Sequence, residues 1–221
     1  MGLASNLLAR VRGAASPAAT LYADSTDQKA VCNSRGELLV AQCLPPKAEL
    51  VRLGNSYSMA IPTASAFTPV AAMPTTLSNL SLRNGEAAGG KTYVIDTIGV
   101  TAITSIAAAS SFTLLAQQQS GAAALTNNTA VLIQSLSGKP NYGGKGTRAL
   151  ATTTAVADSW TIVGSQAASP SASIGAGAFA EVYGLFLIPP GSTFYVNCVF
   201  STAAGTAIQT ITWHEVQLDL G

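Results

Sequence analysis

Hydrophobic and polar residues alternate with a period of two along most of the chain after residue 75, which is typical of half-buried β-strands. The clearest alternation runs from Ala207 to Leu218. One of its faces carries Ile208, Thr210, Thr212, His214, Val216 and Leu218, and the other carries Gln209, Ile211, Trp213, Glu215, Gln217 and Asp219. A further strand is predicted at 93–103, which is rich in β-branched residues. The remaining predicted strands cover 111–117, 130–136, 159–163, 180–188 and 193–201.

Two turn signals, Pro189-Pro190-Gly191 and Ala203-Ala204-Gly205, separate the last three predicted strands. We therefore expect an antiparallel meander at the C-terminal end. Many short strands with turn signals, and no amphipathic helix of useful length, indicate an all-β fold, an antiparallel β-sandwich or jelly roll. We assign this sandwich to residues 76–221 and predict an extended N-terminal arm ahead of it.

Residues 31–75 are predicted to be a linking segment of short strands or a hairpin. Arg35-Gly36 is a turn signal, and the apolar run Glu37 to Gln42 predicts a short strand that stops before Pro45-Pro46. The run Lys47 to Arg52 has charges on both sides of an apolar pair, and we expect an extended or hairpin element there.

Residues 1–30 are predicted to be the extended arm, because they lack a period-two pattern and Pro17 interrupts them. The stretch offers few apolar anchors, so it cannot join a core by itself. A segment of this kind can order on contact with a partner protein. The candidate attachment residues are Leu3, Leu7, Leu8, Arg10, Val11 and Arg12.

The charge content is low for a soluble domain. Charged residues make up 10% of the chain and the formal net charge is +1, whereas about 25% charged residues is usual. This composition, with only two arginines in the arm, excludes nucleic acid as the expected partner. The hydrophobic fraction of 48% excludes disorder for most of the chain. No stretch has the roughly 20 uninterrupted apolar residues of a spanning helix, so we expect no membrane partner.

The cysteines do not form a disulfide framework, since the chain has only three: Cys32, Cys43 and Cys198. We predict that they are free, and whether Cys32 and Cys43 pair with each other stays open. His214 is the only histidine, and no C-x-x-C pair occurs. The sequence therefore predicts no metal site and no cofactor.

One motif matches a phosphate-binding loop. Residues Gly85 to Thr92 fit the pattern G-x-x-x-x-G-K-[ST], in which backbone amides and the lysine hold phosphates. That chemistry needs a helix to begin at the end of the loop, but here Lys91 leads into a predicted strand. We interpret the motif as the loop of a hairpin.

Residues for catalysis are not arranged in a known pattern, since no G-x-S-x-G occurs. We interpret His214 as a packed or hydrogen-bonded residue of its strand, and Trp160 and Trp213 as buried sandwich tryptophans. No enzymatic activity is predicted. A carboxylate pair for glycoside hydrolysis would have to come from residues that we expect at the solvated surface or at strand ends, namely Asp96, Asp158, Glu181, Glu215 and Asp219.

Several short runs resemble those of a class of small β-sandwich virion proteins from tailed bacteriophages and their prophages. The first group comprises Ser34 to Gln42, Leu44-Pro45-Pro46 and Glu49 to Gly54. The second comprises Asn84-Gly85, Gly89-Gly90-Lys91, Pro189-Pro190-Gly191 and Trp213-His214-Glu215. The resemblance covers most of the chain beyond residue 30.

The resemblance implies a non-enzymatic structural protein of the virion, assembled in the bacterial host cytoplasm, such as a head decoration, cement or fibre-base protein. It also implies a homo-oligomer, with a trimer as first choice, and contacts with other virion proteins such as the major capsid protein. The low charge independently favours apolar surfaces that are buried in a symmetric assembly. Two alternatives stay open, a tail or neck component and a receptor- or glycan-binding module, for which the loops offer mainly Tyr142 and Phe179.

Overall fold

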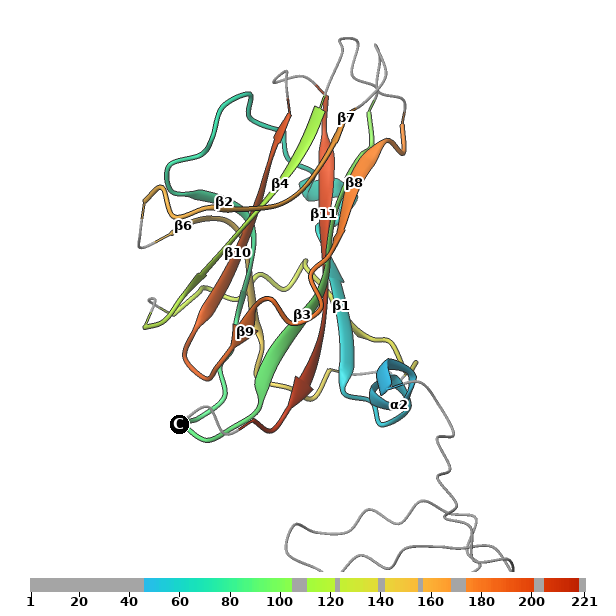
Figure 1. The fold of residues 1–221 in the computed structure, drawn as a ribbon, viewed down its shortest axis with the longest axis vertical. Coiled ribbons are helices and arrows are strands. Elements are labelled where there is room, and N and C mark those ends of the chain that lie inside the picture. The colour runs from blue at the N-terminus through green and yellow to red at the C-terminus, as the bar shows by residue number, and fades with distance from the viewer. Residues whose placement is uncertain are drawn as a thin grey trace, which may run out of the picture. The chain divides into compact units, whose positions relative to one another are not determined.

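The computed structural model describes residues 46–104, 111–121, 124–138, 142–154, 157–167, 174–200 and 205–218. Two antiparallel sheets pack face to face (Figure 1). The first has the order β5-β1-β11-β3-β8, with β9 also paired to β3, and the second has the order β6-β2-β10-β4-β7. The strands are β1 (Ser56–Ala60), β2 (Leu77–Arg83), β3 (Thr92–Ala102), β4 (Ser111–Gln119), β5 (Ile133–Ser135), β6 (Thr147–Thr153), β7 (Thr161–Ala167), β8 (Gly177–Glu181), β9 (Leu187–Ile188), β10 (Thr193–Phe200) and β11 (Ala207–Val216).

The strand order confirms the predicted all-β sandwich. With β5, β6 and β9 set aside, four strands of the first sheet (β1, β11, β3, β8) face four of the second (β2, β10, β4, β7). The chain passes from one sheet to the other at β1–β2, β2–β3 and β3–β4, and again at β7–β8, β8–β10 and β10–β11. Eight antiparallel strands interleaved between two sheets in this way form a jelly roll.

The predicted C-terminal meander is wrong. β10 pairs with β2 and β4 in the second sheet, whereas β11 pairs with β1 and β3 in the first. The turn signals mark the ends of these strands correctly. Alternation along a strand specifies which residues share a face, but it carries no information about which strand lies beside it.

The predicted strand 180–188 is interrupted. β8 ends at Glu181 and β9 begins at Leu187, with a tight turn between them. Tyr183 and Gly184 in this turn have φ angles of 34° and 82°, which a continuous strand does not allow. The carbonyl oxygen of Asp96 accepts hydrogen bonds from the backbone N–H groups of Val182 (2.8 Å) and Tyr183 (3.2 Å) and so holds the turn against β3.

The extended element predicted at Lys47 to Arg52 is also wrong, because Pro46–Arg52 forms the short helix α2. Pro46 is the first helical residue, where its missing N–H costs nothing. Glu49 and Arg52 form a side-chain pair at spacing i,i+3, with Nε of Arg52 2.7 Å from Oε2 of Glu49. Gly54, with φ of 77°, follows the helix end. The predicted strand 37–42 lies outside the described residues.

β1 belongs to the sandwich although it precedes residue 76, where we expected the sandwich to begin. It pairs with β11 over its whole length, from Ser56 opposite His214 to Ala60 opposite Thr210. β6 was not predicted, and the strand predicted at 130–136 is reduced to the three residues of β5. A 3-10 turn, η1 (Thr63–Ser65), follows β1. Among the described residues, no helix has the length and apolar character needed to cross a membrane.

The core lies between the two sheets. Along β11 the two predicted faces are confirmed: the face of Gln209, Ile211, Trp213 and Glu215 is buried and the other face is half-buried. The second sheet contributes apolar residues from alternate positions of β2, β4 and β10, and two of these, Phe112 and Phe200, meet edge to face with ring centroids 4.4 Å apart. The side chains fully enclosed include Leu80, Leu82, Ile95, Ile98, Phe194 and Trp213.

Candidate functional site

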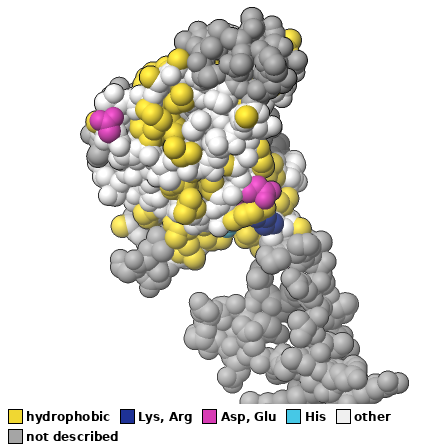
Figure 2. Space-filling view, turned by 45° about the horizontal axis from the view of Figure 1, so that its top comes forward, with side chains coloured by type: hydrophobic (Ala, Val, Ile, Leu, Met, Phe, Trp, Pro, Cys, Tyr) yellow, Lys and Arg dark blue, Asp and Glu magenta, His cyan; other side chains and the backbone are white. Residues whose placement is uncertain are grey.

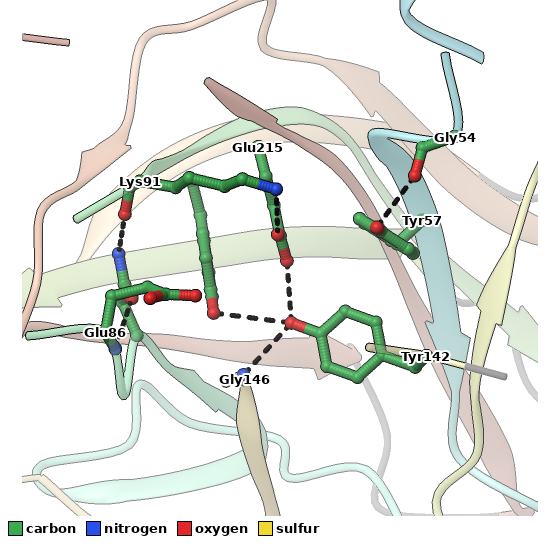
Figure 3. A network of polar contacts seen from close by, with 9 residues as sticks. Gly54, Tyr57, Glu86, Lys91, Tyr142, Gly146 and Glu215 are labelled. Carbon is green, nitrogen blue, oxygen red and sulfur yellow. Dashed lines mark hydrogen bonds and ion pairs between the residues drawn. The ribbon is translucent and has the colours of Figure 1, made fainter. Parts of the chain in front are cut away.

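A buried polar network lies on the inner face of the first sheet, where Glu215 of β11 meets Tyr142 (Figure 3). The hydroxyl of Tyr142 donates a hydrogen bond of 2.6 Å to Oε1 of Glu215 and accepts one of 3.0 Å from the backbone N–H of Gly146. It also lies 3.3 Å from the hydroxyl of Tyr93 on β3. Nζ of Lys91 lies 3.7 Å from Oε2 of Glu215, whose side chain is 0% exposed. Three segments far apart in the sequence, 91–93, 142–146 and the end of β11, therefore meet at this network.

Aromatic rings surround this carboxylate. Tyr57 of β1 packs against Tyr142 with ring centroids 4.8 Å apart in an edge-to-face arrangement, and both rings pack on Trp213. The hydroxyl of Tyr57 donates a hydrogen bond of 2.7 Å to the carbonyl oxygen of Gly54, just before β1 (Figure 3). The rings keep water away from Glu215, so its few polar contacts are strengthened by the low local dielectric constant.

This environment changes the titration of the network. Burial raises the pKa of the Glu215 carboxyl above its ordinary value of 4.5, and this effect exceeds the lowering by the hydrogen bond from Tyr142 and by the charge of Lys91. Burial likewise raises the pKa of the Tyr93 and Tyr142 hydroxyls. Both tyrosines therefore stay protonated, and Tyr142 remains a hydrogen-bond donor to Glu215.

Glu215 lies at a strand end, as expected, one residue before β11 ends, but the expected solvated surface is wrong because its side chain is buried. Alternation places Glu215 on the same face as Trp213, and that face points into the core. The partner that makes burial tolerable, Tyr142, is 73 residues away in the sequence. The sequence near either residue therefore carries no sign of this hydrogen bond. Tyr142, which we considered as a loop aromatic for glycan binding, is half-buried in this network.

A second polar cluster lies on the outer face of the first sheet. Nδ1 of His214 lies 3.0 Å from Oδ2 of Asp96, which confirms the interpretation of His214 as a hydrogen-bonded strand residue. Nζ of Lys47 on α2 lies 3.5 Å from Oδ1 of Asp96 and 3.9 Å from the centre of the Tyr183 ring. The hydroxyl of Tyr183 donates to Oε2 of Glu181. These contacts hold α2 and the turn after β8 on the sheet.

The two clusters do not form a pair of catalytic carboxylates. Asp96 and Glu215 point to opposite faces of the first sheet, since one contacts the outward residue His214 and the other the inward residue Tyr142. Asp158 and Glu181 are exposed as expected. Asp219 lies outside the described residues.

The phosphate-loop motif connects β2 with β3. Strands flank it on both sides as predicted, but they belong to different sheets, so the predicted hairpin is wrong. Asn84 organises the loop: its Nδ2 donates to the carbonyl oxygens of Lys91 and Ile188, both at 2.8 Å, and its Oδ1 accepts from the N–H of Glu86 at 3.0 Å. Because Thr92 begins β3, the helix N-terminus of a phosphate-binding loop is not formed at this point.

The other predicted residues are placed as follows. Trp213 is fully buried, as expected, whereas Trp160 is only half-buried. Cys198 is buried in β10, and burial raises the pKa of its thiol. The attachment residues Leu3, Leu7, Leu8, Arg10, Val11 and Arg12, together with Cys32 and Cys43, lie outside the described residues. Among the described residues, no group of three or more His, Cys, Asp or Glu could hold a metal ion.

The fold is an antiparallel β-sandwich with jelly-roll topology. Its first sheet carries the buried carboxylate of Glu215 on the inner face and the Lys47–Asp96 ion pair on the outer face. Comparisons with protein-family models, with curated proteins and with solved structures give no match.

Proposed function

We propose that this chain is a non-enzymatic structural protein of the virion of a tailed bacteriophage, of the head decoration, cement or fibre-base type. It forms a homo-oligomer, with a trimer as first choice, and attaches to the particle through other virion proteins such as the major capsid protein. Assembly takes place in the cytoplasm of the bacterial host.

The observation that carries this proposal is a jelly roll with large hydrophobic side chains on its surface and few charges around them. Ile174 is 72% exposed, Leu185 is 65% exposed and Phe179 is 64% exposed. Figure 2 shows one face on which hydrophobic side chains gather in bands while few charged side chains appear. Monomers rarely expose such surface unless a partner covers it. Jelly rolls recur in viral capsids, which supports the same proposal by analogy of fold.

The polar clusters fit a structural role. Glu215 is engaged by Tyr142 and Lys91, and Asp96 by His214 and Lys47. Each cluster connects elements that the sheets alone do not fix, namely the segment of Tyr142 and the helix α2. Contacts that join distant segments in this way favour one arrangement of the chain.

The test is the composition of the particle. Virions of the phage or prophage that encodes the chain are purified by density gradient, and the copy number of the chain is measured by quantitative mass spectrometry. We expect the chain in intact particles, in a fixed ratio to the major capsid protein, and absent from the gradient fractions of host protein. A chain found only in the free protein of the lysate would contradict the proposal.

Separated heads and tails decide between the sites on the particle. A chain that follows the tails favours the tail or neck component. The receptor- or glycan-binding module is favoured by the two exposed aromatic side chains Phe179 and Tyr183, which are 64% and 59% exposed. Binding of the wild-type chain to a glycan array, lost in Tyr183→Ala, would support that module in place of the structural protein.

A further inference from the structure

The most exposed large hydrophobic side chains gather along one edge of the sandwich. β7 and β8 are the last strands of their sheets and lie at the same edge. Of the six large hydrophobic side chains that are at least 59% exposed among the described residues, only Leu132 lies elsewhere. The other five lie on β7, on β8 or in the turns that flank β8: Ile162, Ile174, Phe179, Tyr183 and Leu185.

We propose that this β7–β8 edge is the contact between copies of the chain in the trimer, with each copy using two different surfaces, one on either side of the edge. The inference rests on the proposed oligomeric function and names the surface that performs it. The partner at the edge is a second copy of the same chain.

The surface on the β8 side lies on the outer face of the first sheet. Ala178 and Ala180 point into the core, so Phe179 between them points outward. It lies over Gly99: a Cβ built on Gly99 would be 3.3 Å from Cδ2 of Phe179 and 2.8 Å from Oγ1 of Thr210. The phenyl ring therefore covers the sheet where only a glycine leaves room for it.

The surface on the β7 side lies on the outer face of the second sheet. Ile162 pairs with Leu115, and the neighbours of Leu115 on β4, Leu114 and Ala116, belong to the core. Ile162 therefore faces outward and is 62% exposed, whereas its neighbour Leu115 is fully buried beneath this surface. Gly164 shows the inward side of β7, because a Cβ built there would lie 3.2 Å from Cβ of Ala180.

Apolar residues on both sides of one edge fit a ring and not a two-fold contact. A two-fold contact uses one self-complementary surface, whereas a closed ring brings one surface of each copy against a different surface of the next. Around a three-fold axis, the β7–β8 edge of each copy presents its Ile162 side to one neighbour and its Phe179 side to the other. The three edges together then bury all five exposed side chains near the axis.

The charges of this edge permit such packing. The seven residues of β7 include no charged residue, and β8 carries only Glu181 at its end. Natural proteins protect free edge strands with charges or cover them with other segments. At the opposite edge of the second sheet, β6 is covered by the segment that contains Asn128 and Val131. Nε of Arg148 on β6 donates a hydrogen bond to the carbonyl oxygen of Val131. The backbone N–H of Asn128 donates one of 2.8 Å to the carbonyl oxygen of Arg148.

The side chain of Tyr183, beside the β7–β8 edge, is held in place within the single chain. The Asp96 carbonyl oxygen accepts the backbone N–H of Tyr183, whose φ is 34°, and Lys47 lies over its ring. A left-handed φ in a residue other than glycine is strained, and such positions gather at functional sites. An aromatic ring that is already immobilised loses little entropy on contact, as the anchors of interfaces do.

The test uses charged substitutions at exposed positions, with the mass of the full chain in solution measured by sedimentation velocity. Ile162→Lys and Phe179→Lys each place a charge on one of the two surfaces. Leu132→Lys is the matched control, because Leu132 and Ile162 are both 62% exposed. We expect trimers of the 22.3-kDa chain for the wild type and for Leu132→Lys, and monomers for the two edge variants. Trimers in either edge variant, or loss of the trimer in all three, would overturn the proposal.

Mixing tests the use of two surfaces. Ile162→Lys keeps an intact Phe179 side and Phe179→Lys keeps an intact Ile162 side, so an equimolar mixture should form a dimer with one native contact. A mixture that stays monomeric contradicts the ring. A wild-type chain that is monomeric in solution but present in virions would overturn this edge contact and leave the virion role in place. A chain that is trimeric through this edge but absent from virions would overturn the virion role and leave the edge contact in place.

Discussion

Tyr142 donates a hydrogen bond of 2.6 Å to Glu215, across 73 residues of sequence, and so joins the segment after β5 to the last strand of the first sheet. The contact is enclosed by Tyr57 and Trp213. A hydrogen bond enclosed in this way is stronger than one at the surface, because the local dielectric constant is low.

Tyr142→Phe should lower the free energy of unfolding by about 1–3 kcal/mol, because it leaves a buried carboxylate oxygen and the N–H of Gly146 without this partner. Urea denaturation followed by circular dichroism measures the change. Tyr183→Phe is the control, since its hydroxyl bonds to the exposed Glu181, and it should change stability by less than about 0.5 kcal/mol. Equal losses in the two variants would show that the network of Glu215 adds nothing to the fold.

The pH dependence of stability should carry the signature of Glu215. Because its pKa is raised in the folded protein, the fold binds this proton more tightly than the unfolded chain does. The resulting stabilisation is fully present below pH 4.5 and is lost as the pH rises through the folded pKa. Relative to Glu215→Gln, the wild type should therefore lose free energy of unfolding between pH 4.5 and neutral pH.

The check is a series of denaturation curves for the wild type and Glu215→Gln across that range. Lys91→Met provides a second comparison, since it removes the positive charge 3.7 Å from Oε2 and should make the loss with rising pH steeper. A wild type that gains stability relative to Glu215→Gln as the pH rises would mean that attraction by Lys91 outweighs burial.

Strand existence could be predicted from the sequence where alternation was strong. The segment 207–218 alternates without a break and its faces were predicted correctly, and the predicted strands 93–103 and 193–201 correspond to β3 and β10. Short elements could not be predicted. α2 has seven residues, fewer than the two or three turns that a helical period needs in order to be visible.

The partners of each strand and of each buried polar group could not be predicted, because they depend on contacts across long sequence separations. The sequence around Glu215 contains no signal that Tyr142 is its hydrogen-bond partner. The turn after β8 follows the same rule: Tyr183 adopts its left-handed conformation through the carbonyl oxygen of Asp96, which belongs to another strand. In both cases tertiary contacts override the local pattern.

The reactivity of the cysteines gives a further prediction. Cys198 is fully buried, and burial raises the pKa of its thiol, so it should not react with Ellman's reagent in the native protein. Under denaturing conditions without reductant, the chain should show three thiols if Cys32 and Cys43 are free, as we predict, and one if they pair. Cys198→Ala should lower the denatured count by one and leave the native count unchanged; a lower native count would show that Cys198 is accessible.

Residues 1–30 should be dispensable for the fold and required for attachment to the particle. Among the described residues, the core is built from β1 to β11, and α2 leads directly into β1. The arm contributes Leu3, Leu7, Leu8 and Val11 at near-helical spacing, with Arg10 and Arg12 beside them, which suits a groove on a partner protein.

A truncation that begins at Val31 tests this role. It should keep the β-type circular dichroism spectrum and the oligomer mass of the full chain, because the proposed contact between copies lies at the β7–β8 edge. Its incorporation into particles should be lost, since the arm gains its structure and its binding energy together on contact with the partner. Full-length chain with Leu3, Leu7 and Leu8 changed to Ser should behave like the truncation. Normal incorporation of the truncated chain would place attachment elsewhere, and a truncated chain that fails to fold would show that the arm belongs to the sandwich.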